Sequence, residues 1–188
     1  REQRRRGAPE AEVRARVGQP LVGQEIELIT VLMRRIKFDP YVPEPIFFAW
    51  EEVFYNCAVE LAILKNGPIG DEILLVCRPS TDPFYAGQWH MPGAIILPGQ
   101  KIAHALKNLQ RLELGVLVGD PVFVHMFEFL KDERPRGQGF TFLHQMRVKG
   151  DLATDFSRGQ FFPINQLPEP TIEHHVTMIK RIKAFNNA

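Results

Sequence analysis

The chain has 188 residues, a length that suits one domain with an extension. Hydrophobic residues make up 45% and charged residues 24%, which is ordinary for a globular protein, and the net charge of +1 gives no general reason to expect nucleic-acid binding. No apolar run is long enough to span a membrane and no secretory signal is visible, so we expect a cytoplasmic protein.

Residues 1–45 are expected to form an N-terminal helical arm. Arginines concentrate in residues 1–20, which is typical of a solvated arm, with contact to an acidic partner as the bolder alternative. Residues 24–37 carry apolar side chains at three- and four-residue steps, which predicts an amphipathic helix. Prolines within residues 39–45 cannot continue that helix, so the main domain is expected to cover residues 46–188.

The main domain begins with strand-like apolar segments and contains two helix-like segments. The expected strands or extended segments cover residues 53–64, 72–77, 89–96, 121–130, 139–148 and 160–164, and the expected helices cover residues 101–113 and 171–185. A polar hairpin loop separates the fourth and fifth of these strands. The order of strands, helix, strands and helix predicts an α+β sandwich with helices on a mixed sheet.

One stretch has the outline of a phosphate-processing metal site. Its first part runs from Trp89 to a Pro-Gly pair ending at Gly93, and a second Pro-Gly pair follows. The helix-like segment 101–113 comes next and is closed by Gly115. In this arrangement, carboxylates on the helix would face a backbone loop and hold a divalent cation. Glu113 is the one carboxylate of this kind that the stretch retains.

Residues 89–116 resemble the Nudix box. That box reads Gly, five residues, Glu, seven residues, Arg-Glu, an apolar residue, any residue, Glu-Glu, any residue, Gly, and an apolar residue. The resemblance in fold spans roughly residues 50–188 and implies a Nudix-type α-β-α sandwich. Four charged positions of the box are occupied by other residues in this chain, namely Gln100, Asn108, Leu109 and Leu112.

The reduced box is similar to that of the GDP-mannose mannosyl hydrolases, a Nudix branch that also has Leu where Leu109 stands. The resemblance implies one Mg²⁺ or Mn²⁺ held by the Gly93 carbonyl and Glu113, with Arg78 binding the substrate phosphate. That branch carries a Gln-His pair in a later loop, whereas the comparable stretch here offers Asp155 as a ligand or base. Arg78 as a strand-end surface charge and Glu113 as an exposed helix residue are the simpler alternatives.

Two functions follow from the resemblance. The first is a Nudix hydrolase that cleaves a nucleoside diphosphate linked to another moiety, of the nucleotide-sugar type. The alternative is a catalytically inactive Nudix-fold module that binds a nucleotide or a protein partner, which the lost box charges favour on chemical grounds. Trp89 is expected to be a packing residue that could also stack on a base or sugar.

Leu109 and Leu112 continue the apolar series of their helix, so they are predicted to lie in the core. If they were exposed instead, they would form an apolar patch of the kind that marks a contact. A homodimer through this Leu109/Leu112 face, or through the N-terminal helix, is therefore an expectation as well.

Overall fold

The computed structural model describes residues 23–35, 46, 49, 54–97, 99–114, 119–148 and 159–187. The chain divides into two compact units, Arg1–Val42 and Pro43–Ala188, which are treated separately. In the first unit, helix α2 (Gly23–Arg35) confirms the helix predicted for residues 24–37. The arginine-rich residues 1–20 and residues 36–45, which lead to the predicted domain boundary, lie outside the described residues.

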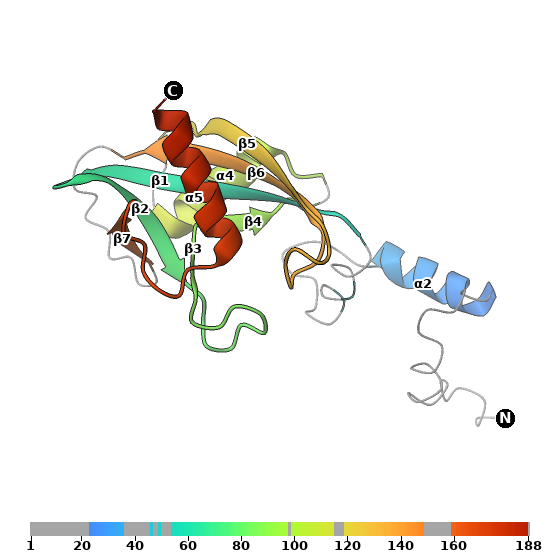
Figure 1. Ribbon diagram of the computed structural model, residues 1–188. Coiled ribbons are helices and arrows are strands. Elements are labelled where there is room, and N and C mark those ends of the chain that lie inside the picture. The colour runs from blue at the N-terminus through green and yellow to red at the C-terminus, as the bar shows by residue number, and fades with distance from the viewer. Residues whose placement is uncertain are drawn as a thin grey trace. The chain divides into compact units, whose positions relative to one another are not determined.

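The second unit contains seven strands and two helices among its labelled elements, in an order that matches the prediction (Figure 1). These elements are β1 (Asn56–Gly67), β2 (Gly70–Cys77), β3 (Trp89–His90), β4 (Gly93–Ile95), α4 (Ile102–Leu114), β5 (Val122–Phe129), β6 (Gly139–Arg147), β7 (Gly159–Pro163) and α5 (Glu173–Asn186).

The seven strands form one mixed sheet with β1 at its centre. The main order is β3-β2-β1-β6-β5, while β4 also pairs with β1 and β7 pairs with β2. Strands β1 and β6 are parallel, and the other pairings are antiparallel. The pairing of β1 with β4 sets Glu60 opposite Gly93, which later defines the site.

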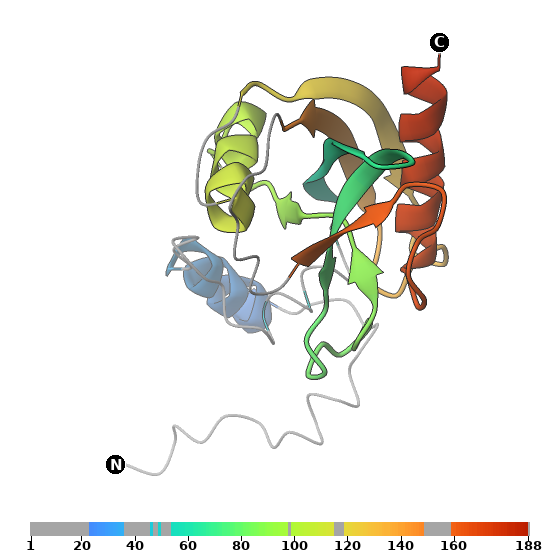
Figure 2. The same ribbon diagram turned by 90° about the vertical axis from the view of Figure 1, so that its left-hand side faces the viewer.

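Alternation along β1 builds a core on each face of the sheet. Val59, Leu61 and Ile63 pack with apolar residues of α4, including Leu109. Ala62 and Leu64 pack on the other face, in the cluster that contains the α5 residues Met178, Ile179 and Ile182. Because successive side chains of a strand point to opposite faces, α4 and α5 lie on opposite sides of the sheet (Figure 2). The predicted α-β-α sandwich is thereby confirmed.

Two details differ from the prediction. The extended segment expected over residues 89–96 is two short strands, because Pro92 has no N–H to donate and its carbonyl instead accepts from the Leu61 N–H at 2.9 Å. Leu112 is 78% exposed, whereas Leu109 is 2% exposed, so placing both in the core was wrong for Leu112. The two residues lie about 60° apart around the helix, and Leu112 falls outside the buried stripe.

None of the described helices is long and apolar enough to cross a membrane.

Candidate functional site

A pocket of about 250 Å³ lies beside β1, on the face of the sheet that also carries α5. Its floor is the ladder between β1 and β4, where Ala58 pairs with Ile95 and Glu60 pairs with Gly93. Asn56, Ala58 and Glu60 occupy alternate positions of β1, so their side chains share this face. The small residues in the middle of the floor leave room above the strand.

Gly93 makes a close approach to Glu60 that a residue with a side chain could make only if the Glu60 carboxyl group moved. A Cβ built on Gly93 would lie 2.3 Å from both carboxylate oxygens of Glu60. Glycine is needed here for space and not for its backbone conformation, since Gly93 is not among the positive-φ glycines. The hydrogen atom of Gly93 therefore permits the Glu60 carboxyl group to lie against β4 at the bottom of the pocket.

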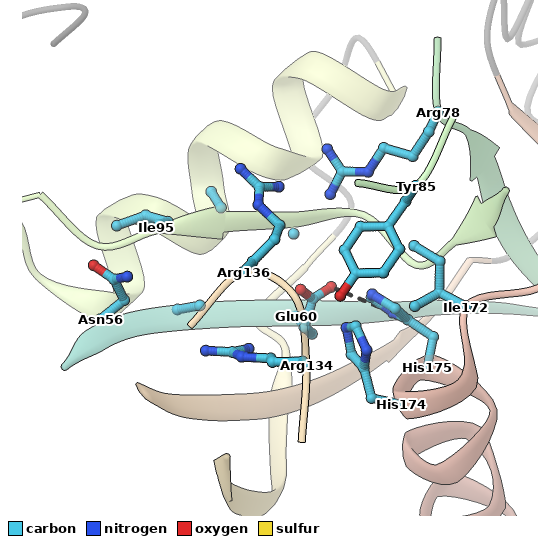
Figure 3. Close-up of a pocket in the computed structure, with 13 residues that line it drawn as sticks. Asn56, Glu60, Arg78, Tyr85, Ile95, Arg134, Arg136, Ile172, His174 and His175 are labelled. Carbon is cyan, nitrogen blue, oxygen red and sulfur yellow. Dashed lines mark ion pairs between the residues drawn. The ribbon is translucent and has the colours of Figure 1, made fainter. Parts of the chain in front are cut away.

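Arginine side chains reach the pocket from two loops. Arg78 follows β2, while Arg134 and Arg136 belong to the loop between β5 and β6 (Figure 3). Arg134 donates from Nε to the Gly137 carbonyl at 2.8 Å, and its guanidinium lies 4.9 Å from the centre of the Phe129 ring. These contacts hold the β5–β6 loop against the pocket.

Arg78 and Tyr85 are positioned together by Asp82. The Asp82 carboxylate accepts from the backbone N–H groups of Phe84 and Tyr85 at 3.0 and 2.9 Å, and it lies 3.7 Å from the Arg78 guanidinium. Tyr85 is 6% exposed, and its hydroxyl finds no hydrogen-bond partner among the described residues. Nε of Arg78 likewise has none within the described part of the chain. Two donors are therefore buried at the pocket wall without an acceptor from the described residues.

Glu60 supplies the carboxyl group of the pocket, and none of the other described residues that line it is acidic. Burial raises its pKa to about 8, although the nearby charges of Arg78, Arg134 and Arg136 oppose that shift. At neutral pH the carboxyl group is therefore mostly protonated and neutral. A neutral Glu60 does not offset the charge of the three guanidiniums, although the Asp82 carboxylate lies 3.7 Å from that of Arg78.

Histidines close the pocket at the α5 end and are uncharged. Burial, with Arg134 as the next cause, lowers the pKa of His174 to about 4, and burial lowers the pKa of His175 well below its ordinary value. Nδ1 of His175 lies 3.9 Å from Glu60, but it also accepts from the Met91 N–H at 3.3 Å. The contact drawn as an ion pair in Figure 3 is thus a contact between two neutral groups.

The structure brings some of the predicted site residues together and leaves others apart. Arg78 and Gly93 both line the pocket. Trp89 is not among the lining residues, and its ring packs edge-on against Phe162 at a centroid distance of 4.9 Å. This is a packing contact of the kind expected for Trp89, and its stacking on a base or sugar stays a prediction.

Glu113 belongs to α4, but its side chain, like the whole of Asp155, lies outside the described residues. The roles predicted for these two residues remain predictions.

The box positions on and before α4 offer a poor set of metal ligands. The Gln100 side chain accepts locally from the Leu97 N–H at 3.0 Å, Leu109 is buried and Leu112 points to solvent. Among the described residues, no group of three or more His, Cys, Asp or Glu side chains could hold a metal ion. Because Mg²⁺ and Mn²⁺ prefer carboxylate oxygens, these residues do not fit a three-carboxylate site.

Several residues of the pocket were missed by sequence reasoning. Arg134 and Arg136 were assigned to a polar hairpin loop, and two arginines in such a loop are a signal of binding. Glu60 stands between Val59 and Leu61, and a lone acid inside an apolar strand is a second signal. Asn56 and the two histidines carry no comparable signal in the sequence.

The fold is that of the MutT/Nudix proteins. No protein-family model and no curated protein matches the chain. Solved structures do match. A mutT/nudix family protein from Listeria innocua has 18% identity over 70% of this chain and 94% of its own, with a TM-score of 0.61. The MutT NUDIX hydrolase from Burkholderia pseudomallei has 18% identity, with 69% and 98% covered and a TM-score of 0.55.

A third similar structure contains a ligand. The NUDIX domain of Shewanella oneidensis NrtR, complexed with ADP ribose, has 15% identity to this chain. The match covers 78% of this chain and 94% of that domain, with a TM-score of 0.56. This low-identity likeness, like the other two, concerns the fold.

Proposed function

We propose that the protein is a Nudix-fold binding module for a nucleoside diphosphate linked to a second group. Its diphosphate would be held by guanidiniums rather than by a metal ion. The observation that carries the proposal is the convergence of Arg78, Arg134 and Arg136 on one pocket whose carboxyl group, Glu60, is neutralised by burial.

The charge of the pocket calls for an anion. The pKa of Arg78 is lowered first by burial and then by repulsion from Arg136, so the Arg78 guanidinium is poorly solvated and lies near a second positive charge. A bound diphosphate would relieve that repulsion, because guanidiniums bind phosphate oxygens through paired, charge-assisted hydrogen bonds. The buried donors on Arg78 and Tyr85 would gain acceptors at the same time.

The size of the pocket agrees with part of such a ligand. A cavity of about 250 Å³ is slightly smaller than a usual ligand pocket, so it suits a diphosphate with one ring, and the remainder of the ligand would extend outside. A similar fold, the NUDIX domain of NrtR, has been solved in complex with ADP ribose, a molecule of this chemical class.

The test is calorimetric titration with ADP-ribose in the presence of EDTA, then with Mg²⁺. We expect binding in EDTA and no gain from Mg²⁺. Arg136→Gln should weaken binding about 10- to 100-fold, as expected for loss of a charge-assisted hydrogen bond. Arg181→Gln, at an exposed position of α5, is the matched control and should bind like the wild type. Binding that requires Mg²⁺, or no binding of any nucleotide in a panel, would overturn the proposal.

Hydrolysis is the second candidate, because the box retains Gly93 and Glu113 at the positions where the resemblance implies one bound metal. Its test is incubation with a panel of nucleotide sugars and dinucleotides plus Mg²⁺ or Mn²⁺, with product release followed over time. Turnover that is lost in both Glu113→Gln and Asp155→Asn would establish this candidate. Absence of turnover in a wild-type protein that binds the ligand would reject it.

A further inference from the structure

Asn56 presents a second recognition element at the end of the pocket away from Arg78 (Figure 3). It is the first residue of β1 and is 6% exposed. Its backbone N–H donates to the Gln138 carbonyl at 3.1 Å. Its side-chain Nδ2, in contrast, finds no hydrogen-bond partner among the described residues. A buried amide donor therefore faces the pocket with no acceptor from the described part of the chain.

A structural role does not account for this side chain. The hydrogen bond to Gln138 uses the backbone, which any residue other than proline supplies. A buried donor without an acceptor lowers stability, and an apolar side chain of similar volume would avoid that cost. The amide is therefore better explained by an acceptor that arrives with a ligand.

The spacing along β1 separates the two ends of the pocket. Asn56 and Glu60 are four residues apart on one face of the strand, a distance of about 13 Å at the usual rise per residue. Ala58 lies between them, opposite Ile95 on β4, and forms a flat apolar floor. A diphosphate at the Arg78 end would thus place an attached ring over Ala58, within reach of the Asn56 amide.

We propose that Asn56 is the residue that selects the group attached to the diphosphate, by donating from Nδ2 to an uncharged acceptor atom on a ring seated over Ala58 and Ile95. This inference rests on the proposed binding of a diphosphate ligand. An amide is neutral and suits a hydroxyl, ring oxygen or base acceptor, whereas the Arg78 guanidinium at the other end suits the charged part. The ring is a sugar or a base, and the two sources are separated by the choice of probes.

The experiment compares Asn56→Leu with wild type by calorimetry, using pyrophosphate, ADP and ADP-ribose as probes. The matched control is Asn165→Leu, at an exposed position outside the pocket. In Asn56→Leu we expect pyrophosphate affinity to change less than twofold and ADP-ribose affinity to fall roughly 3- to 10-fold, the usual range for one neutral hydrogen bond. If Asn56 binds the sugar beyond the diphosphate, ADP affinity is unchanged; if it binds the nucleoside, ADP affinity falls as well.

Thermal unfolding of the unliganded variant provides a readout that a structural asparagine would not give. Asn56→Leu should unfold at the same temperature as wild type or higher, because it removes an unpartnered buried donor. A lower unfolding temperature together with equal loss of affinity for all three probes would overturn the inference, as would unchanged affinity for all three. If wild type binds nothing, pyrophosphate included, the proposed function fails; if it binds but Asn56→Leu does not discriminate, the inference alone fails.

Discussion

The carboxyl group of Glu60 lies against the α-carbon of Gly93, in the space that a side chain on that residue would occupy. A Cβ at Gly93 would stand 2.3 Å from both oxygens of Glu60. The two residues are direct partners in the β1–β4 ladder. The glycine that the Nudix-like motif contributes is therefore also the one that admits an acid to the floor of an arginine-lined pocket.

Gly93→Ala should destabilise the protein through this contact. We expect a loss of roughly 1–3 kcal/mol in the free energy of unfolding, typical of an overpacked site, because either Glu60 or β4 must move. Combining it with Glu60→Ala should recover most of that loss, since the clashing atoms are gone. Chemical denaturation of the two single variants and the double variant measures the coupling. Additive losses would show that the two residues do not interact.

Glu60→Gln should change how stability depends on pH. Burial raises the pKa of Glu60 to about 8 from 4.5, so the folded state keeps a proton that the unfolded state releases above pH 4.5. This group's contribution to stability is therefore complete below pH 4.5 and is lost as pH rises to about 8. Glutamine does not titrate. The free energy of unfolding of the variant should therefore rise relative to that of wild type across that window, by on the order of 3 to 5 kcal/mol at its upper end.

Urea denaturation at pH 5, 7 and 8.5 tests this prediction for Glu60→Gln. Glu173, an exposed acid at the start of α5, supplies the control. The free energy of unfolding of Glu173→Gln should depend on pH in the same way as that of wild type. Curves for Glu60→Gln that also run parallel would mean that Glu60 is ionised in the folded protein.

The same substitution at two positions of α4 should have opposite outcomes. Leu109 is 2% exposed and packs with Val59 and Leu61, whereas Leu112 is 78% exposed. Leu109→Glu should cost on the order of 4 kcal/mol, because it removes core contacts and buries a charge. Leu112→Glu should change the free energy of unfolding by less than about 0.5 kcal/mol. Thermal or urea unfolding measures both, and similar losses would contradict the burial described for this helix.

Arg78→Lys tests whether binding depends on guanidinium geometry or on charge alone. Lysine keeps the charge but cannot donate in a planar pair to phosphate oxygens, so ADP-ribose affinity should fall about 10-fold. Arg181→Lys, on the exposed side of α5, should leave affinity unchanged. A titration series at increasing salt should also show weaker binding by wild type, because part of the attraction is electrostatic. Equal affinity of Arg78→Lys and wild type would remove Arg78 from the phosphate contacts.

The sequence by itself determined the elements and their stacking. Apolar periodicities placed α4 and α5, and the strand-like segments corresponded to β1, β2, β5, β6 and β7 within a few residues. These features depend on neighbours along the chain, so a local pattern reveals them. The spacing between the segment that begins at Trp89 and the one that ends at Gly115 and Val116 likewise indicated the Nudix-type fold, because it reflects one loop and one helix.

The pocket was decided only by the tertiary structure. Pairing of β1 with β2 and β6, together with the packing of α5 on the same face of the sheet, brings Glu60, Arg78, Arg136 and His174 together from four separate parts of the chain. The motif visible in the sequence lies on α4, which covers the opposite face of the sheet, where Leu109 is part of the core. Strand alternation put Glu60 on the α5 face, and its charge state then followed from burial. No stretch of sequence contains that information, because burial and pocket charge depend on contacts between distant residues.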